Sequence, residues 1–250
     1  MQTLQIGTTQ IGIIASLYYL TYTPMQLFVG TIMDHFGVRW PLTIATVSCA
    51  IGIYIFSFPV LLYTKLGMLL IGFGSAFAFV GVLKLASDWL PEQYFALISG
   101  LTTTLGMFGA ISGETVSVQL IEKNGISQTM IMLAVLGLLL TIIMFFSIKD
   151  KKLRKVKGCS NEVWQLFSDL VFVIKNKQIW IVGFIGMLMY TPTTTFAGLW
   201  GIPFVQITRH IPIHDAGIIV SAIFLGWIVG APLVGLLTNA LQNRKSILCV

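Results

Sequence analysis

Long apolar runs separated by short polar connections dominate the sequence. A helix needs about 20 apolar residues to cross a lipid bilayer, and seven runs reach roughly that length, with Ser246–Val250 reading as the start of an eighth. Because backbone polar groups find no water in lipid, these runs are expected to be α-helices. The predicted spans are Ile11–Met33, Pro41–Tyr63, Leu66–Leu90, Phe95–Leu120, Thr129–Ile148, Trp180–Phe204 and Ala216–Leu236.

The composition supports the same fold class. Hydrophobic residues make up 56% of the 250 residues and charged residues only 10%, whereas soluble proteins carry about 25% charged residues. We therefore predict an all-α polytopic membrane protein. The three cysteines are far apart and odd in number, which indicates neither a disulfide framework nor a metal site. No phosphate-binding loop is present, and neither an enzyme nor a cofactor is predicted.

The distribution of positive charge predicts the orientation. Lys and Arg concentrate in cytoplasmic connections. The connections on the side of residues 149–177 hold eleven of them, those on the opposite side hold three, and Lys84 lies inside a span. The basic connection, residues 149–177, is therefore expected in the cytoplasm. The net charge of +6 is explained by topology and not by nucleic acid. Met1 then falls outside, so the chain is expected to be a piece of a larger protein.

Glycines and charged residues gather between the first two predicted spans, in the stretch GTIMDHFGVRW. Gly30, Asp34, Gly37 and Arg39 form a pattern that resembles the signature loop of the major facilitator superfamily, which joins helices two and three of twelve on the cytoplasmic side. Gly30 would let two helices approach closely, and Gly37 would permit a turn with positive φ. Asp34 and Arg39 would form a boundary charge pair that latches one conformation. The alternative is a polar turn with solvated charges.

A second, degraded copy of this loop follows the seventh span. Gly235 and Arg244 lie 205 residues after Gly30 and Arg39, and such carriers contain two related halves. The resemblance implies a partial bundle covering family helices two to eight and the start of nine. Residues 1–148 would be the remainder of the N-terminal half, 149–177 the linker and 178–250 the start of the C-terminal half. Residues 72–91 are also similar to a bacterial branch near the lysosomal dipeptide carriers.

The resemblance implies a function as well as a fold. A member would move a small solute across a bacterial inner membrane by alternating access, either facilitatively or coupled to an ion such as H⁺. Two alternatives remain open. Seven spans with an outside N-terminus are also typical of a membrane receptor or sensor, and the chain could be a non-functional fragment of a carrier.

Two ionisable residues inside spans are candidates for function, because buried charge in a membrane is costly. Lys84 either binds an anionic group of the substrate or snorkels and pairs with Asp88, four residues on. Glu114 either couples transport to a proton or snorkels at the outer end of its helix. Both interpretations stay open for each residue.

Neutral polar side chains mark a candidate substrate cavity. Gln26 and Tyr190 would line it, and Pro192 would kink the helix beside Tyr190. The alternative for both is an ordinary hydrogen bond between helices. In the basic connection, Asn161–Asn176 has an apolar face that predicts an amphipathic helix at the inner membrane surface. The basic residues before it would favour anionic lipid.

Overall fold

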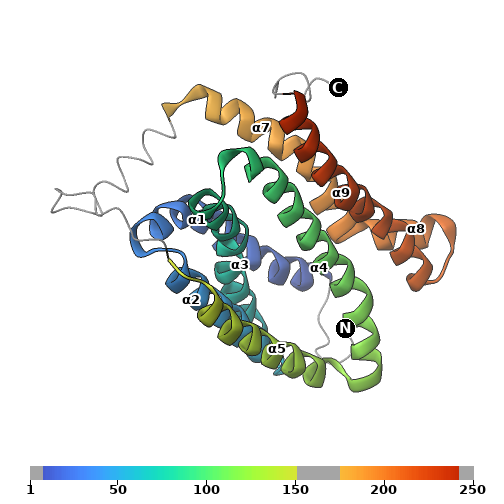
Figure 1. Cartoon of the computed structure of the whole chain (residues 1–250). Helices are drawn as coiled ribbons and strands as arrows, with labels where there is room; N and C mark the ends of the chain where they lie inside the picture. The colour runs from blue at the N-terminus through green and yellow to red at the C-terminus, as the bar shows by residue number, and fades with distance from the viewer. Residues whose placement is uncertain (1–7, 151–174, 242–250) are drawn as a thin grey trace. The chain divides into compact units, whose positions relative to one another are not determined.

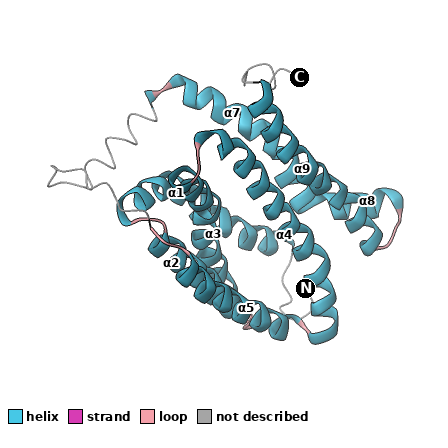
Figure 2. Cartoon of the chain, viewed as in Figure 1, coloured by secondary structure: helices cyan, strands magenta, loops and turns pink. Residues whose placement is uncertain are grey.

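Helices make up every regular element that the structure describes. The computed structural model describes residues 8–150 and 175–241, and those residues contain no strand (Figure 2). This confirms the predicted all-α class. The elements, traced in Figure 1, are α1 (Thr8–Phe36), α2 (Arg39–Phe56), α3 (Leu61–Trp89), η1 (Glu92–Tyr94), α4 (Phe95–Asn124), α5 (Ile126–Ser147), α7 (Lys177–Thr191), η2 (Pro192–Trp200), α8 (Gly201–Arg209) and α9 (Ile213–Leu241).

Six of the described helical segments are long and apolar enough to cross a membrane: Arg39–Phe56, Leu61–Trp89, Phe95–Gly113, Ile126–Ser147, Lys177–Gly198 and Asp215–Leu237. The six do not include α1, the first of the seven predicted spans, although it has 29 residues. Its polar side chains lower its hydropathy, and two of them bond to α3. Thr21 donates to the carbonyl of Leu69, and Gln26 donates to the carbonyl of Ala76.

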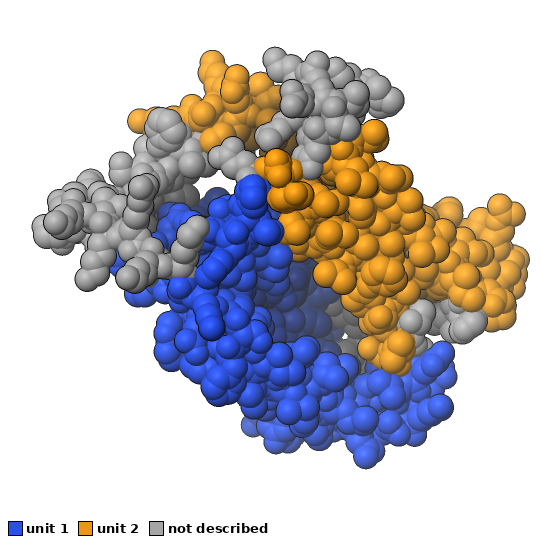
Figure 3. Space-filling view, in the orientation of Figure 1, with its two compact units in different colours: residues 1–91, 119–158 blue, residues 92–118, 159–250 orange. Residues whose placement is uncertain are grey.

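The chain divides into two compact units, coloured separately in Figure 3. Unit 1 comprises residues 1–91 and 119–158, and unit 2 comprises residues 92–118 and 159–250. The assignment of residues 1–148 and 178–250 to two halves of a family bundle stays a prediction.

Unit 1 is built from α1, α2, α3 and α5. Its buried cluster includes Val29 and Met33 of α1 and Phe77 of α3. Glycines permit the close contacts in this unit. A Cβ on Gly52 of α2 would lie 2.8 Å from the carbonyl oxygen of Gly67 in α3, and a Cβ on Gly67 would lie 2.6 Å from that of Gly52. The two backbones therefore touch where both side chains are absent.

Unit 2 packs α4 and the segments from α7 to α8 against α9. Met107, Ala197, Val220 and Phe224 form its buried cluster. The predicted sixth span is one continuous helical stretch whose middle, from Pro192 to Trp200, is a π-helix. Pro192 has no N–H to donate, which favours such a change of hydrogen-bond register.

Several predicted features lie outside the described residues. These are Arg244, the amphipathic segment Asn161–Asn176 up to residue 174, the adjoining basic stretch and the start of the eighth span. The interaction with anionic lipid therefore stays a prediction.

Candidate functional site

The turn between α1 and α2 requires glycine at residue 37. Gly37 has a φ of 79°, as the sequence predicts. A Cβ there would also lie 2.8 Å from the carboxyl carbon of Asp150, so the Asp150 side chain would have to shift. A residue with a side chain would meet backbone strain at this φ and would displace the Asp150 carboxylate.

Asp34, near the end of α1, pairs with Lys84 of α3. Lys84 Nζ lies 2.6 Å from Asp34 Oδ1 and 3.5 Å from Asp88 Oδ1. The predicted pairing of Lys84 with Asp88 is therefore present, and Asp34 adds a second carboxylate. Since two acids already balance its charge, Lys84 fits a helix-end role, and its binding of a substrate anion stays a prediction.

Arg39 makes its contacts with α5 and not with Asp34. Its Nε donates to the carbonyl of Phe145 at 2.9 Å, and its guanidinium carbon lies 4.0 Å from the centroid of the Phe145 ring. The expected Asp34–Arg39 charge pair is thus wrong in this structure. The reason is that both residues find partners on other helices. Their roles in gating stay predictions.

Asp150 supplies the anion at the start of α2. Its Oδ1 accepts hydrogen bonds from the backbone amides of Val38, at 2.8 Å, and Arg39, at 3.0 Å. The first amides of a helix have no partner within the helix and favour an acceptor of negative charge. Asp150, three residues after the end of α5, therefore caps the first residues of α2.

The two glycines of the repeated loop have different surroundings. No described atom of another helix lies within 4 Å of a Cβ built on Gly30, so the predicted close helix approach is not found there. Gly235 does sit at such an approach, because its Cβ would lie 2.8 Å from the carbonyl oxygen of Ala96 in α4. The two positions differ because the backbone of α9 passes close to that of α4 at Gly235.

The candidate cavity residues occupy separate units. Gln26 of unit 1 is half-buried and donates to the carbonyl of Ala76 at 3.3 Å, which is the ordinary interhelical bond named as its alternative. Tyr190 of unit 2 lies edge-on to Trp227, with ring centroids 5.8 Å apart. Glu114 lies in α4, and its side chain is outside the described part, so its coupling role stays a prediction.

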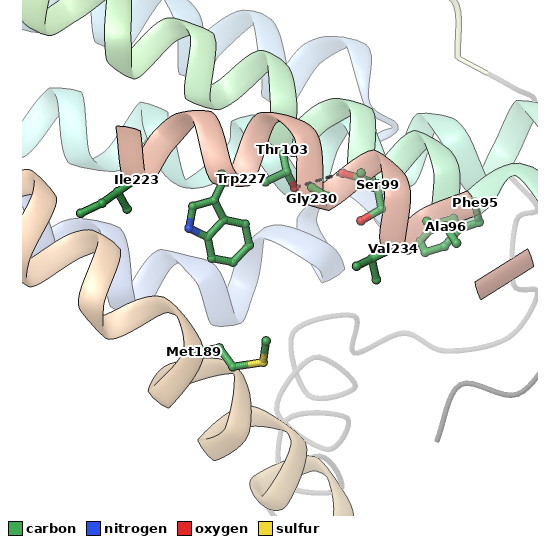
Figure 4. Close-up of a pocket in the computed structure, with 13 residues that line it drawn as sticks. Phe95, Ala96, Ser99, Thr103, Met189, Ile223, Trp227, Gly230 and Val234 are labelled. Carbon is green, nitrogen blue, oxygen red and sulfur yellow. Dashed lines mark hydrogen bonds between the residues drawn. The ribbon is translucent and has the colours of Figure 1, made fainter. Parts of the chain in front are cut away.

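A pocket of about 700 Å³ opens in unit 2 between α4, α7 and α9 (Figure 4). Its described lining contains no charged side chain. Ser99 and Thr103 present hydroxyls from α4, and Trp227 presents its indole from α9. The pocket can therefore hold a small molecule against an aromatic ring with a few hydroxyls beside it.

The indole of Trp227 is held in place by the π-helix. Its Nε1 donates to Oγ1 of Thr193 at 2.7 Å, and Thr193 is buried. Because the N–H already has a partner, the indole offers the pocket apolar ring surface and not a donor. Sequence reasoning missed Trp227, although a tryptophan in the middle of a span is a usable signal, since spans usually carry tryptophan at their ends.

The comparison with protein families decides the identity. A family model described as Major Facilitator Superfamily matches residues 1–250. The chain belongs to this family. Family membership agrees with the predicted fold and points to a transporter and not an enzyme, inserted in the membrane as a multi-pass protein.

Three bacterial relatives of this superfamily member are named as transporters. The uncharacterized transporter YybO of Bacillus subtilis is 34% identical over 116 residues, covering 43% of this chain and 25% of the relative. The hexuronate transporter of Bacillus subtilis is 26% identical, covering 62% of this chain and 37% of the relative. The probable sulfoacetate transporter SauU of Cupriavidus necator is 22% identical, covering 64% of this chain and 38% of the relative. The chain thus spans less than half the length of these relatives.

Metal binding has no support among the described residues of this superfamily member. No group of three or more His, Cys, Asp or Glu side chains there is arranged to hold an ion. The similarity to carriers near the lysosomal dipeptide branch stays a prediction.

Proposed function

We propose that the protein takes part in secondary transport of a small organic anion by alternating access in a bacterial plasma membrane. The family match over residues 1–250 carries this proposal. A membrane receptor or sensor would not be expected to match a carrier family along its whole sequence. Two relatives are named for hexuronate and sulfoacetate, which are both organic anions. They support that substrate class.

The unit 2 pocket would hold the uncharged part of the substrate. Its described lining is uncharged, so it fits the neutral part of the solute, such as a polyol or a methylene chain. The Trp227 ring would cover one face of that part, while Ser99 and Thr103 would face its hydroxyls. Two further roles are proposed independently of this pocket: Lys84 of unit 1 would bind an anionic group of a solute in competition with the two carboxylates that it contacts, and Glu114 would be the site of proton coupling.

Uptake into cells that express the intact protein tests the proposal. Radiolabelled hexuronate and sulfoacetate are the first substrates, each measured against cells with an empty vector. We expect one of them to enter, an excess of unlabelled organic acid to compete, and a neutral hexose to compete poorly. A protonophore should abolish accumulation if a proton is coupled. Equal competition by the neutral sugar would contradict the proposal that the substrate is an organic anion. Absence of uptake across a broad panel of solutes would favour the alternative that the chain is a non-functional fragment.

The proposed orientation makes a prediction of its own. Because residues 149–177 hold most of the positive charge, Cys159 is expected on the cytoplasmic side. With Cys49 and Cys249 replaced by serine, a membrane-impermeant maleimide applied to intact cells should leave Cys159 unlabelled until the cells are permeabilised. A cysteine at Lys123, at the end of α4, should react from outside and provides the matched control. Labelling of Cys159 in intact cells would reverse the orientation.

A further inference from the structure

The end of α8 carries an exposed cation beside a second pocket of unit 2. Arg209 is the last residue of α8, and its side chain is exposed. The pocket, called the α8–α9 pocket below, has a volume of about 740 Å³ and is lined by Phe204, Val205, Thr208, Arg209, Ile211 and Ile219. Four of these residues are apolar and Arg209 is the charged one. The α8–α9 pocket therefore combines an apolar wall with a single positive charge.

A left-handed residue after α8 brings the wall together. His210 has a φ of 53°, and its backbone amide donates to the carbonyl of Gln206 at 2.9 Å. A residue in this conformation ends a helix and turns the chain away from its axis. The chain then reaches α9, which begins at Ile213 and packs against α8. Ile211 of the short connection and Ile219 of α9 thus join the residues of α8 around the pocket.

The polar groups of the α8–α9 pocket differ in what they can offer a ligand. The Thr208 hydroxyl donates to the carbonyl of Phe204 at 2.5 Å, so its hydrogen is already used within α8. Arg209 forms no salt bridge with an acid in the part of the chain that the structure describes. An anion at this pocket would therefore be bound by the guanidinium of Arg209. The apolar part of the same molecule would contact Phe204 and Ile219.

The place of this pocket in the fold favours a lipid as that molecule. The charge distribution predicts that the connection between α8 and α9 lies at the outer membrane surface. At that level of a bilayer, phosphate groups lie directly beside acyl chains. A small organic anion would satisfy Arg209 but leave the apolar wall uncovered. A phospholipid would satisfy the cation and also cover the wall, which adds the free energy of apolar burial.

We propose that the α8–α9 pocket binds an anionic phospholipid of the outer leaflet. Its phosphate pairs with Arg209, and one of its acyl chains lies against Phe204 and Ile219. This site is distinct from the basic connection at residues 149–177, which is expected at the opposite membrane surface. The bound lipid holds the turn between α8 and α9 at the membrane surface. The inference does not depend on the identity of any solute or on transport itself.

Native mass spectrometry of the intact protein, freed of lipid in detergent, tests the charge at this site. Phosphatidylglycerol is titrated, and the affinity for the first bound lipid is compared between variants. Arg209→Gln should lower this affinity by about fivefold, the effect of one cation on anionic lipid, and should change the affinity for phosphatidylcholine much less. Lys123→Gln is the matched control, since Lys123 is also an exposed cation in the last turn of a helix and lines neither described pocket. It should leave both affinities unchanged.

A second pair of variants tests the acyl chain. Ile219→Trp would fill the α8–α9 pocket and should weaken the binding of phosphatidylglycerol. Ile218→Trp is its control, because Ile218 is 57% exposed, against 52% for Ile219, but does not line the pocket. Glycerol phosphate, which has the anion without acyl chains, should not displace the lipid. The proposal is overturned if Arg209→Gln has no more effect than Lys123→Gln, or if both tryptophan variants weaken binding equally. Displacement by glycerol phosphate would also overturn it, because the site would then be one for a small anion.

Discussion

Gly74→Ala is expected to destabilise unit 1 strongly. Gly74 of α3 faces α2, and a Cβ there would overlap the carbonyl oxygen of Ala45 and lie 2.5 Å from Sγ of Cys49. The oxygen belongs to the α2 backbone, so the two helices would have to separate along a contact that Gly52 and Gly67 continue. Overpacking of this kind typically costs about 1–3 kcal/mol. The measurement is the fraction of monodisperse protein that survives heating in detergent.

Gly30→Ala is the matched control for this prediction. Gly30 is also a helical glycine in unit 1, but no described atom of another helix lies within 4 Å of its Cβ position. Alanine is the better helix former by up to about 1 kcal/mol. The Gly30 variant should therefore match or exceed the stability of the natural protein. If both variants lose stability equally, contact between helix backbones is not the reason.

The existence of the helices could be predicted from the sequence, but one turn between them could not. The sequence predicts a second span over Pro41–Tyr63, whereas α2 ends at Phe56 and α3 begins at Leu61. The turn contains Phe58, Pro59 and Val60, which are as apolar as the spans around them. Hydropathy alone cannot separate an apolar turn from the middle of a helix. Pro59 was the local signal for the boundary.

The partners of the signature loop were also beyond sequence reasoning. The positive φ of Gly37 could be predicted because it is a property of a single residue in a turn. Lys84 follows Asp34 by 50 residues, and Asp150 follows Arg39 by 111 residues. Charges so far apart can pair in several ways, and only the packing of α1 on α3 and of α2 on α5 selects among them. The nearest opposite charge, Arg39 for Asp34, was therefore the wrong choice.

Trp227→Ala is expected to weaken solute binding in the unit 2 pocket more than any other single change there. The variant removes the aromatic surface and opens the wall between α7 and α9. Loss of a central aromatic contact costs about 2 kcal/mol, which corresponds to about thirtyfold in affinity. The apparent KM for uptake should therefore rise by about that factor, once a transported solute has been identified. Trp227→Phe keeps a ring but loses the bond to Thr193, so its KM should rise less.

Two further variants separate binding from general damage to unit 2. Thr193→Val removes the acceptor of the Trp227 N–H at nearly constant volume, so it should resemble Trp227→Phe, because both free the ring to reorient. Trp200→Ala removes a tryptophan that is 66% exposed and does not line the pocket. It should leave KM unchanged at equal expression. A natural KM in Trp227→Ala, or an equal rise in Trp200→Ala, would show that the solute does not rest on the Trp227 ring.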